Sequence, residues 1–100
     1  MKLSKIYKAR TYKRAKSLCP KGYYLPERWE LMKLLDEGKG KKLMNAEEGW
    51  RFFWSNTVIR NLVACANLYS DGSWNSVYEG LVRSDDVGRV VFFKSGGEGK

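Results

Sequence analysis

Residues 63–78 read VACANLYSDGSWNSVY, and this stretch decides the fold class more than any other part of the chain. Two runs of strand-forming residues, 63–69 and 73–78, flank Ser70-Asp71-Gly72. An Asp-Gly pair between two such runs is a strong signal for a β-hairpin. The pattern therefore predicts two adjacent antiparallel strands joined by a tight turn.

The second of these runs, residues 73–78, has two chemically different faces. Trp74, Ser76 and Tyr78 share one face of such a strand, whereas Asn75 and Val77 share the other. The chain holds four tryptophans in 100 residues, and a domain of this size buries most of its large rings. We therefore predict that Trp74 lies in the core.

Apolar runs on both sides of the hairpin predict three further strands. Phe52-Phe53-Trp54 is a short run, and residues 87–94 suit a buried closing strand. Residues 3–8 suit a first strand, with Leu3 and Tyr7 on one side of it. Residues 95–100 are rich in glycine and predict a disordered tail, so that residues 1–94 form a single domain.

Two helices are expected between the first strand and the later ones. Thr11 is a suitable N-cap for the first helix, which Pro20 and Gly22 end. Its buried face would carry Tyr12, Ala15 and Cys19. Its solvent-exposed face would carry Lys13, Arg14 and Lys16.

In the second helix Pro26 suits the first position, Glu27 and Glu30 favour the N-terminal end, and Gly38 suits the C-cap. Its apolar stripe would be Leu31, Leu34 and Leu35, widened by Trp29 and Met32. Residues 45–49 suit one more helical turn. Helices early and strands late make the chain an α+β domain.

The positive charge of the chain is concentrated at its start. The formal net charge is +8, and residues 1–22 hold eight Lys and Arg residues and no acid. Such a segment, residues 2–21, suits an acidic partner, an anionic surface or nucleic acid, or it is simply a solvated face. No apolar run is long enough to span a membrane and no signal peptide is recognisable, so the localisation stays open.

The reactive residue types are few. The chain has two cysteines, Cys19 and Cys65, and no histidine, which excludes Cys–His and Ser–His–Asp catalysis. Two cysteines do not supply the four ligands of a structural zinc site. We therefore expect neither a metal nor a cofactor. Whether the two cysteines form a disulfide depends on the redox compartment and stays open.

Several short motifs occur in an order that resembles a known fold. They are Gly22-Tyr23-Tyr24-Leu25-Pro26, Glu30-Leu31, Leu34-Leu35, Trp54-Ser55-Asn56-Thr57, Ala64, Asp71-Gly72-Ser73 and Gly88-Arg89-Val90-Val91. Over residues 5–94 the chain resembles the C-type lectin fold in its formylglycine-generating-enzyme-like form. The resemblance implies two helices packed on a small, twisted, mostly antiparallel sheet. It makes Leu25, Pro26, Leu31, Trp54 and Val90 determinants of the fold.

A narrower resemblance is to the variable proteins of diversity-generating retroelements of phages and archaeal viruses, which use this fold. In those proteins the later part of the chain varies at codons that began as Asn, and here four of the five asparagines lie between Trp54 and Ser76. The resemblance implies a non-catalytic module with a variable binding surface over residues 54–86, facing a protein or cell-surface ligand. Tyr, Ser and Asn suit such a surface. Its expected contact residues are Asn56, Val58, Arg60, Asn61, Asn67, Tyr69, Ser73, Asn75, Tyr78 and Glu79.

Three alternatives compete with this interpretation. Formylglycine-generating enzymes use a pair of late cysteines, whereas this chain has only Cys65 there. Calcium-dependent lectins use Trp-Asn-Asp, whereas Trp74-Asn75-Ser76 lacks the carboxylate that calcium requires. Nucleic-acid binding or a structural role through the basic residues 2–21 is the third alternative. Four tyrosines lie among or next to these residues, an arrangement that suits binding of single strands; they are Tyr7, Tyr12, Tyr23 and Tyr24.

Overall fold

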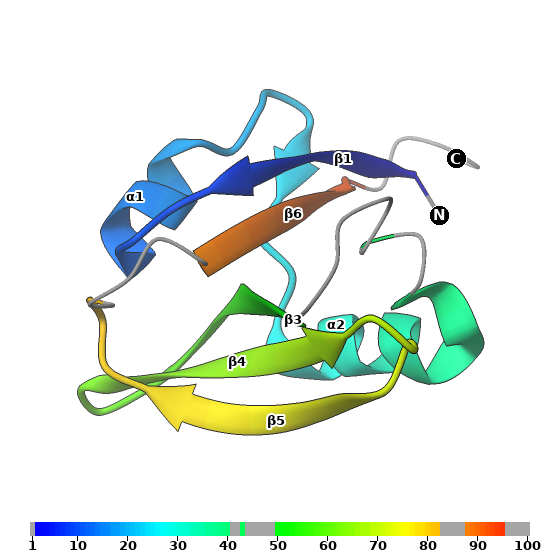
Figure 1. The fold of residues 1–100 in the computed structure, drawn as a ribbon. Helices are drawn as coiled ribbons and strands as arrows, with labels where there is room; N and C mark the ends of the chain where they lie inside the picture. Colours follow the sequence, from blue (N-terminus) through cyan, green and yellow to red (C-terminus); the bar gives the residue numbers. More distant parts are fainter. Residues whose placement is uncertain (1, 41–42, 44–49, 83–87, 96–100) are drawn as a thin grey trace.

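The computed structural model describes residues 2–40, 43, 50–82 and 88–95, and shows a small α+β domain with two helices and a mixed six-stranded sheet (Figure 1). Its elements in chain order are β1 (Leu3–Lys8), α1 (Tyr12–Ser17), β2 (Tyr23–Tyr24), α2 (Arg28–Leu34), the π-helical segment η1 (Leu35–Lys39), β3 (Trp50–Ile59), β4 (Leu62–Tyr69), β5 (Trp74–Glu79) and β6 (Gly88–Lys94). No helix among these described residues is long and apolar enough to cross a membrane.

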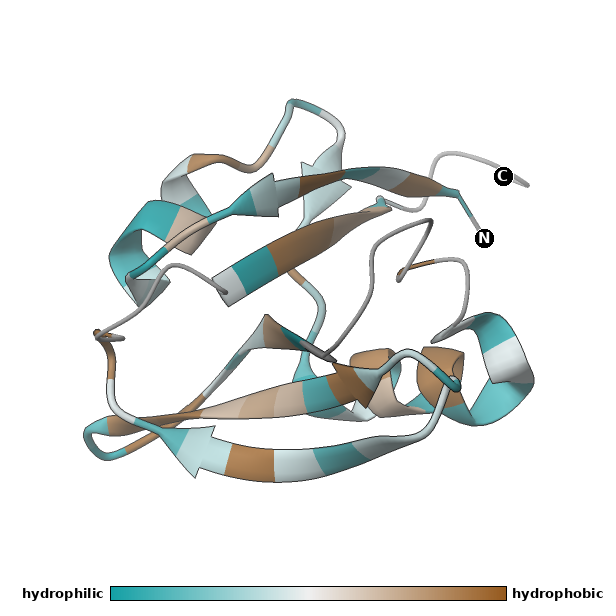
Figure 2. Cartoon of the chain, viewed as in Figure 1, coloured by the Kyte–Doolittle hydropathy of each residue, from teal (hydrophilic) through white to brown (hydrophobic). Residues whose placement is uncertain are grey.

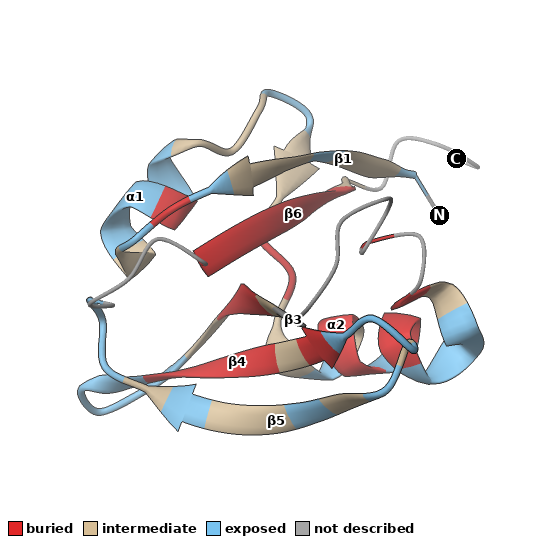
Figure 3. Ribbon diagram, viewed as in Figure 1, coloured by how far each residue is buried: buried red, intermediate tan, exposed pale blue. Residues whose placement is uncertain are grey.

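The last strand, β6, lies at the centre of the sheet. The strand order is β1-β6-β3-β4-β5, and β2 also pairs with β6. β6 runs antiparallel to β1 and parallel to β3, where Phe52 faces Gly88 and Phe53 faces Arg89. All its residues from Gly88 to Phe93 are buried (Figure 3). The predicted buried closing strand is therefore confirmed for these residues, and Val87 lies outside the described part.

The core has two layers, one on each face of the sheet. Alternate residues of a strand point to opposite faces, so Phe53 and Val91 join the layer under α2, while Phe52 and Val90 join the layer under α1. Apolar residues on both faces explain why residues 52–54 of β3 and 90–93 of β6 read as continuous hydrophobic runs rather than as alternating patterns.

The predicted hairpin forms where the sequence places it. β4 and β5 pair antiparallel, with Leu68 opposite Trp74. In the turn, Gly72 has a φ of 91°, which favours glycine, and Asp71 Oδ1 accepts a hydrogen bond of 2.8 Å from the backbone N–H of Ser73. Trp74 is partly buried and packs against the layer under α2.

Helix α1 confirms the predicted start but ends earlier than predicted. Thr11 is its N-cap, and its hydroxyl accepts a 2.9 Å hydrogen bond from the N–H of Arg14. The helix ends at Ser17, so Cys19 follows it, although Cys19 still packs against the layer under α1. Ala15 is fully buried, while the lysines and the arginine of the helix are exposed.

Helix α2 differs from the prediction at three points. It starts after Glu27 rather than at Pro26, because Glu27 and Glu30 form a reciprocal capping box that fixes the N-cap. It ends at Leu34 with Leu35 as its C-cap, and Gly38, the predicted C-cap, lies inside η1 with a φ of 80°. Trp29 is 65% exposed and does not widen the apolar stripe. At 100° per residue it lies on the side opposite Leu31 and Leu35, which are buried.

Strand β1 corrects a third prediction, that Leu3 and Tyr7 share one side. Leu3 faces Phe93 and Ile6 faces Val91. Three residue steps along β1 therefore match two steps along β6, and the pairing register shifts. Such a bulge reverses the inward face of the strand. Leu3 therefore packs in the layer under α2, and Tyr7 in the layer under α1.

The predicted helical turn at residues 45–49 and residues 96–100 of the predicted tail lie outside the described residues. Ser95, which the prediction placed in the tail, donates backbone and hydroxyl hydrogen bonds of 2.8 Å to the carbonyl of Gly22.

Three residues that are distant in sequence meet at the junction of β1, β3 and β6. The indole N–H of the fully buried Trp54 donates a 2.9 Å hydrogen bond to the carbonyl of Ala9. The N–H of Ala9 in turn donates a 3.0 Å hydrogen bond to the carbonyl of Gly88. A Cβ atom on Gly88 would lie 2.3 Å from the Ala9 oxygen and 3.0 Å from the Trp54 nitrogen. Only glycine fits this junction.

We expect Gly88→Ala to lower the free energy of unfolding by about 1–3 kcal/mol, because the added methyl group forces the backbone or Trp54 to move. The measurement is urea unfolding followed by circular dichroism. Gly80→Ala is the matched control, since a Cβ atom there meets nothing within 4 Å. Equal stability of the two variants would contradict the tight junction.

Candidate binding surface

The exposed apolar side chains are gathered at one end of the sheet. Eight large apolar side chains are exposed in the described part of the chain, and six of them lie near the β3–β4 turn and the end of β5. We call these six the apolar end. The backbone of the β3–β4 turn and of the segment that follows β5 lies at the left of Figure 2. The six side chains are Val58, Ile59, Leu62, Tyr78, Leu81 and Val82.

Strand pairing brings the members of the apolar end together. Ile59 faces Leu62 across the last rung of the β3–β4 hairpin, and Tyr78 on β5 faces Ala64, two residues along from Leu62. Arg60 in the turn has a φ of 59°, in the left-handed region that few residues other than glycine and asparagine adopt readily. The hairpin therefore ends in a tight turn with aliphatic side chains on both strands.

Helix α1 is attached directly to this end of the sheet. The N–H of Tyr12 donates a 2.9 Å hydrogen bond to the carbonyl of Leu81, and Thr11 forms an isolated β-bridge with Val82. The hydroxyl of Tyr12 donates a hydrogen bond to Asn56 Oδ1 on β3. These contacts fix the N-terminal end of α1 beside the apolar end.

Three cations of the basic segment, all of them on α1, consequently lie at the same end of the sheet as the apolar end. Lys13, Arg14 and Lys16 are exposed on α1, and Lys16 Nζ lies 5.2 Å from the centre of the Tyr12 ring. Next to the helix is a depression of about 330 Å³ lined by Lys8, Ala9, Arg10, Thr11 and Arg14. Two features that the sequence presents separately, the cations of α1 and the late strands, thus meet at one end of the sheet.

The hydroxyl of Tyr12 adds no negative charge to this surface. Burial, and then the nearby carboxylate of Glu27, raise the pKa of Tyr12 above its ordinary value. The hydroxyl therefore stays protonated at neutral pH and remains a donor to Asn56.

The expected contact residues do not gather at one place. Val58, Arg60, Asn61 and Tyr78 are exposed at the apolar end, and the partly buried Glu79 pairs with Val63 nearby. Tyr69, Ser73 and Asn75 are exposed at the other end of β4 and β5. Seven residue steps separate Leu62 from Tyr69, which is about 23 Å along a strand.

Two of the expected contact residues are directed into the protein. Asn56 is partly buried, its side chain accepts the Tyr12 hydrogen bond, and its N–H donates a 2.8 Å bond to the carbonyl of Pro26. Asn67 is partly buried, and its side-chain oxygen is buried without a hydrogen-bond partner in the described structure. Both therefore contribute little to an exposed surface.

Sequence reasoning missed four residues of the apolar end: Ile59, Leu62, Leu81 and Val82. An aliphatic residue inside a strand pattern is ordinarily a core residue, so the pattern gave no reason to place them outside. The available signal was their position, because the first two flank the Arg60-Asn61 turn and the last two follow Gly80.

Neither cysteine has the surroundings of a nucleophile. Both are free thiols. Cys65 is buried and donates to the carbonyl of Val63 at 3.5 Å, and Cys19 donates to the carbonyl of Tyr23 at 3.2 Å. Burial raises the pKa of the Cys19 thiol, which lowers the share of the reactive thiolate. Among the described residues no three His, Cys, Asp or Glu side chains are grouped to hold a metal.

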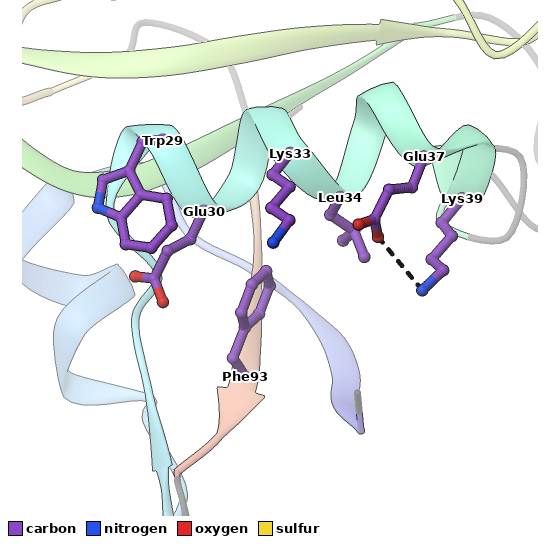
Figure 4. A pocket seen from close by; sticks show the side chains of 7 residues that line it. All are labelled: Trp29, Glu30, Lys33, Leu34, Glu37, Lys39 and Phe93. Carbon is purple, nitrogen blue, oxygen red and sulfur yellow. Dashed lines mark ion pairs between the residues drawn. The ribbon is translucent and has the colours of Figure 1, made fainter.

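A second hollow lies between α2, η1 and the end of β6 (Figure 4). Its volume is about 330 Å³, and its lining is Trp29, Glu30, Lys33, Leu34, Glu37, Lys39 and Phe93. The carboxylate of Glu30 already accepts hydrogen bonds from Tyr24 and from the N–H of Glu27, and Glu37 pairs with Lys39 at 3.4 Å. Two acids and two bases cancel here, so this hollow has no net charge with which to select a ligand.

We expect Asn56→Ala to lower the free energy of unfolding by about 1–2 kcal/mol, because the Tyr12 hydroxyl loses its acceptor. The equally small change Asn61→Ala removes an exposed turn side chain, and it should stay within about 0.5 kcal/mol of the parent protein. Chemical denaturation of the two variants under identical conditions gives the comparison. A larger loss at Asn61 would mean that the two asparagines have the opposite roles.

Comparisons of the chain with protein-family models, curated proteins and solved structures find no match. One fold supports many functions. The function is therefore argued from the chemistry of the apolar end and of the cations beside it.

Proposed function

We propose that this chain is a non-catalytic binding module that presents the apolar end and the cations of α1 to a partner. The observation that carries the proposal is the gathering of six of the eight exposed large apolar side chains at one end of the sheet. Scattered exposed apolar residues are ordinary on a protein surface, whereas a contiguous group marks an interaction site. The free thiols and the lack of histidine favour binding over catalysis.

The proposal includes a scaffold of the C-type lectin type. Three features of the topology support it: β1 pairs with the last strand β6, β6 runs parallel to β3, and both helices lie between β1 and β3 in the chain. The residues that the resemblance marks as determinants of the fold also suit this role. Leu31, Trp54 and Val90 are fully buried, and Leu25 and Pro26 are buried.

The proposal also includes variation of the surface, as in the variable proteins of diversity-generating retroelements. Four of the expected contact residues support it, because their side chains are exposed at the apolar end: Val58, Arg60, Asn61 and Tyr78. Asn56 and Asn67 do not, because replacing them would disturb the contacts of Tyr12 or the packing between strands. We therefore restrict the variable positions to the exposed ones.

Nucleic-acid binding through residues 2–21 is the second candidate, and the cations of α1 favour it. The tyrosines that would stack on bases do not. Tyr7, Tyr12 and Tyr23 pack against the core layer under α1, and the Tyr24 hydroxyl donates a 2.5 Å hydrogen bond to Glu30. Base stacking requires exposed ring faces, so the cations suit an acidic partner better than a single strand.

A surface that varies must tolerate substitution. We expect a combined variant, Val58→Ser with Arg60→Gly, Asn61→Ser and Tyr78→Ser, to lose no more than about 2 kcal/mol of unfolding free energy. Leu68→Ala, a single change at a fully buried position, should cost about 2–5 kcal/mol. Urea unfolding compares the two, and a combined variant as unstable as Leu68→Ala would assign these four side chains to the core.

Templated variation leaves a trace in the genome. We expect a near-copy of the segment that encodes residues from about Trp54 onward, next to a reverse transcriptase gene, with mismatches confined to adenines of the copy. Sequencing of the locus tests this directly. A locus without such a copy removes the variation from the proposal and leaves a binding module with a fixed surface.

A further inference from the structure

We propose that the partner of the apolar end is the surface of an anionic lipid bilayer. The five aliphatic side chains of the apolar end enter the bilayer while the cations of α1 contact the headgroups. We call these five the aliphatic tip; they are Val58, Ile59, Leu62, Leu81 and Val82. The inference rests on the proposed function, because it takes the apolar end as the binding surface, and it adds the chemistry of the partner. Three observations carry it: the aliphatic character of the tip, the charge beside it, and the contacts that hold the two together.

Five of the six exposed apolar side chains of the apolar end are aliphatic. Ile59 and Leu62 face each other at the end of the two longest strands, and Leu81 and Val82 follow at the end of β5. Val82 is 69% exposed. The centres of protein–protein interfaces are enriched in aromatic residues, Met and Arg. Aliphatic side chains on a projecting turn instead suit shallow burial at the boundary between headgroups and acyl chains.

The charge beside the tip complements an anionic surface. Lys13, Arg14 and Lys16 are exposed on α1. None of them forms an ion pair with another described residue; an ion pair in the described part of the chain joins Lys39 to Glu37 on η1. Residues 1–22 contain no acid that could neutralise them. Basic residues next to a membrane are attracted by the negative potential of anionic lipids.

Tyr12 holds the tip and the cations in one geometry. Its N–H binds the carbonyl of Leu81, its hydroxyl binds Asn56, and its ring lies beneath the ammonium of Lys16. Tyr78 adds a half-exposed ring at the same end, and amphipathic rings of this kind favour the headgroup level of a bilayer. Ile59, Leu62 and Tyr78 lie on the face of the sheet that α2 covers, whereas α1 covers the other face. The aliphatic side chains and the cations therefore share one end of the sheet, and the bilayer would be met end-on.

Vesicle flotation of the whole chain tests the inference. We expect binding to vesicles of phosphatidylcholine mixed with phosphatidylserine, and little binding to phosphatidylcholine alone. Ile59→Ser with Leu62→Ser should weaken binding about tenfold or more, because the tip loses its apolar area. Lys13→Gln with Lys16→Gln should weaken it about 25-fold, at roughly fivefold per cation, and added salt should reproduce this effect.

The matched control removes one exposed ring and one cation that lie outside the apolar end. Trp29→Ser with Lys39→Gln does so, because both side chains line the hollow between α2, η1 and the end of β6. This variant should bind anionic vesicles within about twofold of the parent after its fold is verified by circular dichroism, because these side chains lie away from the apolar end.

Three results would overturn the lipid partner. The first is no binding to anionic vesicles, and the second is binding that the tip variant leaves unchanged, which is plain electrostatic adsorption. The third is tighter, tip-dependent binding to polyglutamate or single-stranded DNA than to vesicles. In each case a stable combined variant of Val58, Arg60, Asn61 and Tyr78 still supports a binding module, so the two proposals fail separately.

Discussion

The hydrogen bond from the Trp54 indole to the carbonyl of Ala9 is the contact on which the arrangement of the domain depends. It joins the end of β1 to β3 inside the layer under α1, and Gly88 allows the two to approach because it has no side chain. A buried indole requires an acceptor, so the position of Ala9 is fixed. Helix α1 begins three residues later, at Tyr12, and this is why its cations lie next to the apolar end.

Local signals in the sequence were sufficient for most of the fold. Asp71-Gly72 predicted the hairpin and Thr11 the start of α1, because turn and cap chemistry act over a few residues. The bulge in β1 was not predictable, since an extra residue in a strand shows only against its partner, and that partner lies at the other end of the chain. The exposure of Trp29 was not predicted, because large rings are ordinarily buried, whereas the position of Trp29 on the helix puts it opposite Leu31 and Leu35.

The candidate site was predictable only in part, for a related reason. The turn residues Arg60 and Asn61 were identified because polar side chains in a turn are exposed in any fold. Asn56 was misjudged, since its acceptor role depends on Tyr12, 44 residues earlier in the chain. The joining of the basic segment to the late strands depends on the Thr11–Val82 bridge, which no local pattern encodes. Long-range pairing thus decides which exposed residues become neighbours.

The central position of β6 has a consequence for the way the domain folds. The β3–β4 and β4–β5 hairpins pair residues that are close in sequence, whereas Leu3 pairs with Phe93. Closing so large a loop costs entropy before its contacts form, so the hairpins should assemble first and β6 should join last. Until then the edges of β1 and β3 that β6 covers remain unpaired. A sheet that lacks β6 exposes unpaired strand edges, and such edges favour aggregation.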